Sequence, residues 1–188
     1  MQSRWRAVLT LASITFIVST VLNLGSNSVL AFMPITASLA LLLFIILIGV
    51  LFDILGVAAT AGEEAPFHAM ASKKVPGAKR AIWLVRHADG VSTFCNDLVG
   101  DVVGTLSGAL GVAILLQLRA NAQRLPEALA NTLMVALIAA VTVGGKALGK
   151  NMAITKSTTI LLITGKILHF FDQIGVKLRS LVAKNKRR

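Results

Sequence analysis

Two aspartates and a threonine stand at the start of the long apolar stretch 95–116. Asp97, Asp101 and Thr105 follow one another at intervals of four residues, so they share one face of an α-helix. A carboxylate at the depth of a bilayer costs about 2.5–3.5 kcal/mol, and such groups normally face a protein interior or a water-filled cavity. The pattern therefore predicts an ion-binding site or an ion pathway. For Asp97 a second interpretation stays open, because a hydrated acid near the membrane surface also stabilises a helix N-terminus.

Asp101 fits that second interpretation less well. At 1.5 Å per residue it lies about 6 Å deeper than Asp97. An ionisable group at such a depth is by default a functional residue with a charged partner. Ion handling by this chain therefore depends on Asp101 being surrounded by basic or oxygen-bearing side chains from other helices.

Gly100, Gly104 and Gly108 form the neighbouring face of the same stretch. Glycines at every fourth position let another helix approach closely in a membrane. We expect helix packing at these three residues, and packing there would turn the acids toward the protein interior.

Charges near the ends of two other apolar stretches are candidate partners for these acids. Glu63 follows the second stretch, and Lys146 lies near the end of the fourth. Gly144, Gly145 and Gly149 around Lys146 predict either a broken helix or tight packing. Broken helices within membranes often mark ion sites, because their freed carbonyl groups can act as ligands.

Four apolar stretches must position these side chains: residues 7–24, 29–57, 94–118 and 128–148. A transmembrane helix needs about 20 predominantly apolar residues. The chain is 55% hydrophobic and only 14% charged, and Asp53 is the one charge in the second stretch. We expect an all-α, polytopic helical membrane protein with four spans and juxtamembrane amphipathic helices.

The net charge of +11 comes from cations that gather before the first stretch, between the second and third, and at the end of the chain. Four crossings place all three groups in the cytoplasm, which predicts a multi-pass cell-membrane protein with cytoplasmic termini. The external loops are then 25–28 and 119–127. The same distribution favours anionic lipid of the cytoplasmic leaflet as a partner, rather than nucleic acid. The first stretch is expected to be an uncleaved signal-anchor helix, with a cleaved signal peptide as the alternative.

Two amphipathic segments are expected outside the spans. Within the juxtamembrane region 62–90, apolar residues recur at helical spacing between 77 and 88, which predicts a short helix at the cytoplasmic surface anchored by Trp83. The C-terminal region 157–188 predicts a second amphipathic helix, over 157–182, followed by a basic tail.

Three short motifs, in this order, resemble those of the cyclin M/CorC (CNNM) family of magnesium and divalent-cation transport proteins. The segment TAGEEA (60–65) stands in place of the family's Ser-Gly-Ser-Glu-x-Ala motif. VGD (99–101) resembles Ile-Gly-Asn, and GKALGK (145–150) resembles Gly-Glu-x-x-Pro-Lys. The resemblance runs from about residue 29 to the C-terminus. It implies a signal-anchor helix and loop over 1–28 and a transmembrane domain over 29–188, without the family's cytoplasmic regulatory domain.

This resemblance implies a function, a site and an assembly. The function is transport of a divalent cation, with Mg²⁺ as the transported ion and no cofactor identified. Thr60, Glu63 and Asp101 would supply oxygen ligands, with Glu63 and Asp101 as the metal-binding acids. The assembly is a homodimer.

Lys146 stands where the family has a glutamate, and an ammonium there would repel a divalent ion. The other departures are Thr60 and Gly62 for serines, Asp101 for asparagine and Gly149 for proline. We expect Lys146 to be a tethered cation that pairs with Asp101 or Glu63 in place of the metal. Such a chain would be a transport-deficient relative, or would move its substrate by protonating and releasing the pair.

An enzyme is not expected, and no catalytic residue is identified. The histidines are isolated, and the sequence has neither a phosphate loop nor a Ser/His/Asp arrangement. The single cysteine, Cys95, is expected to be buried rather than reactive. The alternative to a transporter is a non-transporting structural or regulatory membrane protein that acts through helix packing and lipid binding.

Overall fold

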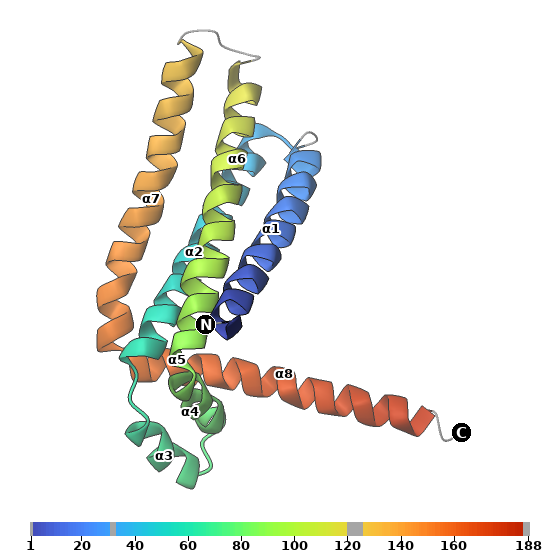
Figure 1. The fold of residues 1–188 in the computed structure, drawn as a ribbon, viewed down its shortest axis with the longest axis vertical. Coiled ribbons are helices and arrows are strands. Elements are labelled where there is room, and N and C mark those ends of the chain that lie inside the picture. The colour runs from blue at the N-terminus through green and yellow to red at the C-terminus, as the bar shows by residue number, and fades with distance from the viewer. Residues whose placement is uncertain (1, 31–32, 120–125, 186–188) are drawn as a thin grey trace. The chain divides into compact units, whose positions relative to one another are not determined.

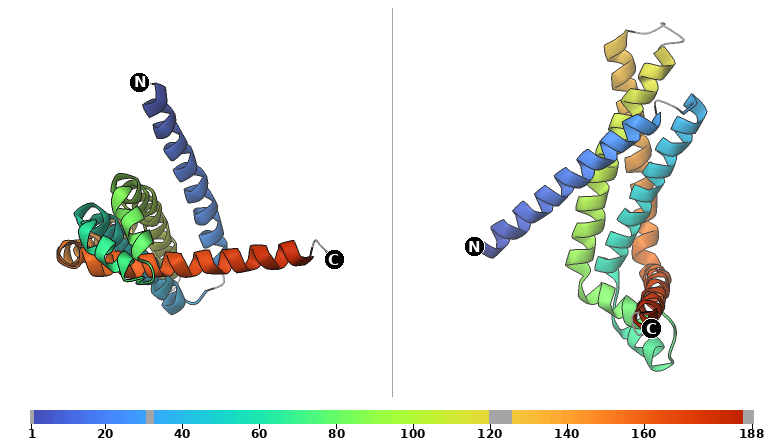
Figure 2. Two further views of the ribbon diagram at one scale, coloured as in Figure 1. Left: turned by 90° about the horizontal axis from the view of Figure 1, so that it is seen from below. Right: turned by 90° about the vertical axis from the view of Figure 1, so that its right-hand side faces the viewer.

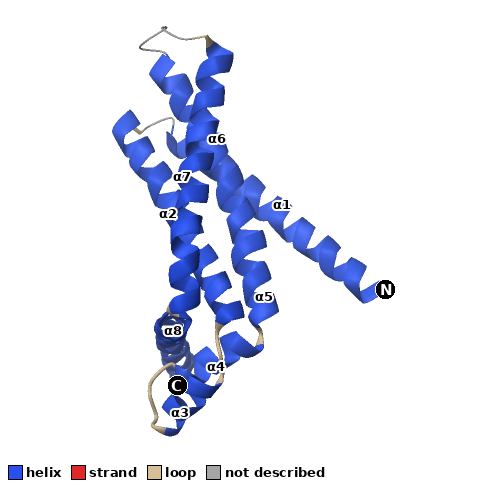
Figure 3. Cartoon of the chain, turned by 90° about the vertical axis from the view of Figure 1, so that its left-hand side faces the viewer, coloured by secondary structure: helices blue, strands red, loops and turns tan. Residues whose placement is uncertain are grey.

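The computed structural model describes residues 2–30, 33–119 and 126–185, and every regular element in this part of the chain is helical (Figures 1 and 3). The elements are α1 (Gln2–Leu30), α2 (Ile35–Ala61), α3 (Ala65–Ser72), α4 (Ala78–Arg86), α5 (Ala88–Ser92), the π-helical segment η1 (Thr93–Val99), α6 (Gly100–Arg119), α7 (Glu127–Thr155) and α8 (Ser157–Asn185). The all-α class is confirmed.

Four helical stretches are long and apolar enough to cross a membrane: Val8–Ser26, Ile35–Ala61, Ala88–Leu118 and Glu127–Thr155. They correspond to the four predicted spans. The third begins earlier than predicted, because α5, η1 and α6 follow one another without a break.

The predicted loop at 25–28 is wrong, because α1 continues to Leu30. Its Gly, Ser and Asn residues weaken a helix without ending it, and the next proline along the chain is Pro34. Of the second predicted loop, 119–127, residues 120–125 lie outside the described part of the chain.

Packing divides the described residues into two units. The first comprises residues up to 54 together with 93–149, and the second comprises 55–92 together with residues from 150 onward. Each unit is described below by itself. The assignment of 1–28 and 29–188 as separate regions stays a prediction.

The first unit is held together by apolar side chains and by glycines at helix contacts. In this unit α1 packs against α6. A Cβ built on Gly49 of α2 would lie 2.6 Å from Val103 of α6, and one built on Gly145 of α7 would lie 3.0 Å from Val50 of α2. The absence of a side chain at these glycines therefore allows the close approach of the helices.

The second unit is built on α8, against which α4 packs, while α3 packs on α4. The helix predicted between 77 and 88 is observed as α4, whose apolar face buries Ala78, Ala81 and Leu84. Gly77 precedes it with φ of 84°, and its backbone lies directly against that of Gly165 in α8. A side chain at Gly77 would be both strained and blocked.

The C-terminal helix predicted over 157–182 is observed as α8. Figure 2 shows that α8 continues well beyond its contact with α4. Its location along a membrane stays a prediction.

Candidate functional site

An ion pair joins two of the span-length helices within the first unit. Lys146 Nζ of α7 lies 3.2 Å from Asp53 Oδ1 of α2. The side chain of Asp53 is 17% exposed and that of Lys146 is 32% exposed. Both residues are therefore largely enclosed by protein, inside helices that are otherwise strongly apolar.

Glycines on α7 allow the two helices to approach at this pair. Gly145 contacts Val50, and a Cβ built on Gly149 would lie only 2.6 Å from Ile54. The glycines around Lys146 thus serve tight packing. The alternative, a broken helix, is wrong, because α7 is continuous from Glu127 to Thr155.

A third helix of the unit, α6, approaches the pair at Gly100, which has no side chain. A Cβ built on Gly100, the first residue of α6, would lie 3.6 Å from Lys146 Nζ. The ammonium group therefore lies beside the backbone of α6 while it binds the carboxylate of α2. In the same unit, the rings of Phe52 of α2 and Phe94 of η1 lie 6.4 Å apart between their centroids.

The electrostatics of the pair follow from its surroundings. Isolated charges are expensive among apolar helices, and their mutual attraction offsets part of that cost. The two charges of the pair cancel, and the pair contains only one carboxylate that could bind a cation. A cation that binds the Asp53 carboxylate has to compete with Lys146 for it.

The start of the third span is irregular at the acids singled out from the sequence. Asp97 lies in η1, where the backbone follows the wider π-helical spacing. The prediction of one regular α-helix through Asp97, Asp101 and Thr105 therefore holds only from Gly100 onward. Such π-helical segments are rare and occur frequently at functional sites.

Asp97, Asp101 and Thr105 are all exposed in the single chain. The burial predicted for Asp101 is not found, and no ion pair of Asp101 occurs within the described residues. The Thr105 hydroxyl donates to the carbonyl of Val102 on its own helix, at 3.0 Å. Instead of Asp101, the acid that pairs with Lys146 is Asp53.

The predicted packing glycines divide into two groups. Gly100 lies beside Lys146, as described above. Apart from the adjoining backbone of α6 itself, no described atom lies within 4 Å of a Cβ built on Gly104 or Gly108. The close helix packing predicted at Gly104 and Gly108 is therefore not made among the described residues.

Thr60 and Glu63 belong to the second unit, and both are exposed. The Thr60 hydroxyl donates to the carbonyl of Val57 at 2.9 Å, so its oxygen keeps lone pairs for a ligand. Their assignment as ion ligands stays a prediction. The described residues contain no cluster of three or more His, Cys, Asp or Glu side chains that could hold a metal ion.

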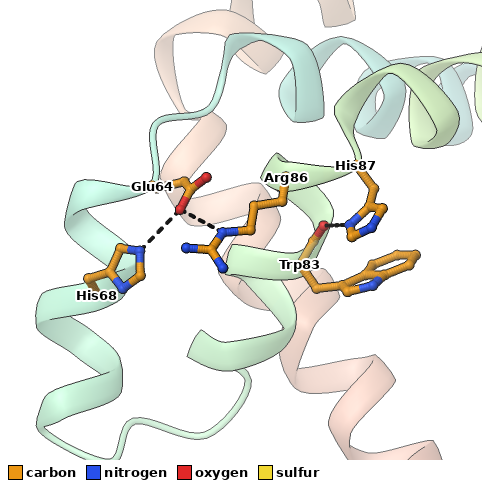
Figure 4. A network of polar contacts seen from close by, with 5 residues as sticks. All are labelled: Glu64, His68, Trp83, Arg86 and His87. Carbon is orange, nitrogen blue, oxygen red and sulfur yellow. Dashed lines mark hydrogen bonds and ion pairs between the residues drawn. The ribbon is translucent and has the colours of Figure 1, made fainter.

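The second unit has its own polar network (Figure 4). Glu64 accepts hydrogen bonds from Arg86 Nε at 2.9 Å and from His68 Nε2 at 3.1 Å. The hydrogen bonds from His68 and Arg86 lower the pKa of Glu64 below its ordinary value of 4.5. This network ties the start of α3 to the end of α4, and Trp83 stacks on His87 beside it.

Sequence reasoning noted Asp53 and did not assign it a role. The available signal was its position as the single charge of the most apolar stretch, because an ionisable residue inside a span normally has a function and a partner. The sequence does not show how α2 is rotated about its axis, and so does not show which of its faces meets α7. The glycines around Lys146 indicate close packing of α7 but do not identify the residue it packs against.

Comparisons with protein-family models, with curated proteins and with solved structures found no match to this chain.

Proposed function

We propose that this chain is an integral membrane protein that moves a cation across the bilayer, with Asp53 as the cation-binding carboxylate and Lys146 as its tethered competitor. The observation that carries the proposal is the Asp53–Lys146 ion pair between two span-length apolar helices. Charged groups in such helices are expensive, and they characteristically mark ion pathways.

The resemblance to divalent-cation transporters supports the choice of cargo. It points to Mg²⁺ or a related ion, which prefers oxygen ligands. In the paired state the site is closed to such an ion, because the ammonium repels it and only one carboxylate is offered. Transport then requires Lys146 to move away from Asp53 before the cation can bind.

Reconstitution into liposomes tests this function directly. Wild-type protein should admit external Mg²⁺, measured with an indicator dye trapped inside. Asp53→Asn should lower the initial rate to that of empty liposomes, because the amide carries no negative charge. Asp89→Asn, an exposed acid in α5, is the matched control and should leave the rate unchanged.

Lys146→Gln provides the second arm of the experiment. Its amide can still donate a hydrogen bond to Asp53 and does not repel a cation, so binding of Mg²⁺ measured by calorimetry should become tighter than in the wild type. Absence of flux from the wild type, or unchanged affinity in Lys146→Gln, would contradict the proposal.

A second candidate function is a non-transporting structural or regulatory membrane protein. Two observations favour it: Lys146 already neutralises Asp53, and no metal-ligand cluster occurs among the described residues. In that case the pair fixes which faces of α2 and α7 meet. The flux assay separates the two candidates, because a purely structural pair gives no rate above that of empty liposomes.

The proposed assembly is a homodimer formed through the open face of α6. This face carries Gly104 and Gly108 beside the exposed side chains of Asp101 and Thr105. Small residues permit close helix contact, and a partner helix would remove the acid from lipid. Thr105→Cys should form an intermolecular disulfide under mild oxidation, whereas Val135→Cys on α7 should not.

The proposed location is the cell membrane, with both termini in the cytoplasm. The charge distribution along the chain supports this orientation. Protease accessibility of N- and C-terminal tags in sealed inverted vesicles tests it, and protection of either tag would contradict it.

A further inference from the structure

A pocket of about 510 Å³ lies in the second unit. Its walls are the end of α3, residues 74–77 of the following turn, the start of α4 and one side chain of α8. A neighbouring pocket of about 480 Å³ shares Pro76 and His169 with it. Because they share these two residues, we treat the two pockets together and name them the α4–α8 pocket.

The α4–α8 pocket is strongly basic. Lys74, Lys79 and Arg80 line its first part, and Lys166 lines its second. None of the described residues that line it is acidic. Asp172 of α8 forms an ion pair with Arg80 and offsets one charge, so the surroundings keep a clear positive excess.

The backbone builds this pocket in advance of any ligand. The turn that carries Lys74 is closed by hydrogen bonds from Lys74 N to Ala71 O and from Val75 N to Met70 O, each 3.0 Å long. Gly77 then fixes the turn against Gly165 of α8. The lysines therefore project from a fixed frame, which lowers the ordering cost of binding.

Apolar side chains lie directly beside the cations. Phe170 lines the second part of the pocket and is 60% exposed. Phe170 belongs to an exposed apolar face of α8, which consists of Ile163, Ile167, Phe170, Phe171 and Ile174. These positions share one side of the helix, while the opposite side, which includes Leu161 and Gly165, is buried within the unit.

A basic pocket next to an exposed apolar face matches the two halves of a phospholipid. We propose that the α4–α8 pocket binds the phosphate headgroup of an anionic phospholipid, with the acyl chains along the apolar face of α8. The apolar face favours a lipid over free phosphate, which has no apolar part to bury. This site is independent of cation transport and stands whether or not the flux assay succeeds.

Native mass spectrometry of the full chain in detergent tests the site. The probes are phosphatidic acid, phosphatidylcholine of the same chain length, and inorganic phosphate. Phosphatidic acid should bind most tightly, and its affinity should fall with added salt. Equal binding of phosphatidylcholine, or competition by millimolar inorganic phosphate, would overturn the assignment to an anionic lipid.

Two sets of substitutions remove the same charge from different places. Lys74→Gln, Lys79→Gln and Lys166→Gln together remove three cations of the pocket. A juxtamembrane lysine contributes about fivefold in affinity for anionic lipid, so the loss should be on the order of 100-fold. The control set is Lys73→Gln, Lys150→Gln and Lys156→Gln, three exposed lysines outside the pocket, and it should change the affinity by about twofold or less.

The apolar half of the site has a separate readout. Phe170→Ser should weaken binding of phosphatidic acid with long acyl chains more than binding of its short-chain analogue. All substituted residues are exposed, so circular dichroism should show unchanged helix content. If the two lysine sets lower the affinity for phosphatidic acid equally, binding reflects general charge attraction, and the proposed headgroup site is wrong.

Discussion

The two units of this chain differ in the surroundings of their lysines. In the first unit, Lys146 and Asp53 lie among apolar helices and bind each other at 3.2 Å. In the second unit, lysines such as Lys74 and Lys79 line a pocket without an acidic neighbour in its wall. The difference shows how strongly the surroundings decide the role of the same ammonium group: it must be paired among apolar helices, and it stays available to a ligand at a polar surface.

Lys146→Met should have the largest effect on stability. It leaves Asp53 enclosed and unpaired, which costs about 3 kcal/mol, the lower end for a broken pair because Lys146 is partly exposed. Denaturant unfolding in detergent micelles measures this loss. Lys150→Met, on an exposed side chain of the same helix, should change stability by less than about 0.5 kcal/mol.

The double variant Lys146→Met with Asp53→Asn sharpens this prediction. Removing both charges should recover most of the lost stability, because no uncompensated charge remains. If the double variant is as unstable as Lys146→Met alone, the lysine contributes through its packing, and the pairing explanation fails.

Gly49→Ala should have an intermediate effect. The added methyl group would lie 2.6 Å from Val103, whose branched side chain has little freedom to move. We expect a loss of about 1–3 kcal/mol in the same unfolding experiment. Gly144→Ala on α7 is the matched control, because its methyl group meets open space and should raise helix stability by up to about 1 kcal/mol. Equal losses at the two positions would contradict the packing described for α2 and α6.

The smallest effect on stability is expected from protonation of Glu64 in the second unit as the pH is lowered. The lowered pKa of Glu64 means that its ionised form stabilises the fold above pH 4.5, and that this contribution disappears as pH falls through the lowered pKa. The difference in melting temperature between wild type and Glu64→Gln should therefore shrink between pH 6 and pH 3. A constant difference over this range would show that the hydrogen bonds from His68 and Arg86 do not depend on ionisation of Glu64.

The sequence predicted the elements of this fold better than their contacts. Apolar length was sufficient to predict the four span-length helices, and the periodicity of Ala78 and Ala81 was sufficient to predict α4. The same reasoning placed a loop at 25–28, between two apolar stretches, and α1 continues through the Gly, Ser and Asn residues there.

The candidate site was predicted only in part, and the reason is geometric. Lys146 was identified as a paired cation, and that expectation was correct apart from its partner. The choice between Asp53, Asp101 and Glu63 depends on how each helix is rotated about its axis, which spacing within a single helix cannot determine. No pattern in the sequence predicted the π-helical segment η1, which contains Asp97.

Cys95 gives this protein a built-in reporter. It is the only cysteine of the chain, it lies within η1, and its side chain is 2% exposed. A thiol-reactive maleimide can therefore label the native chain only when this segment opens. The labelling rate, measured with and without Mg²⁺, follows the breathing of the third span without any engineered tag.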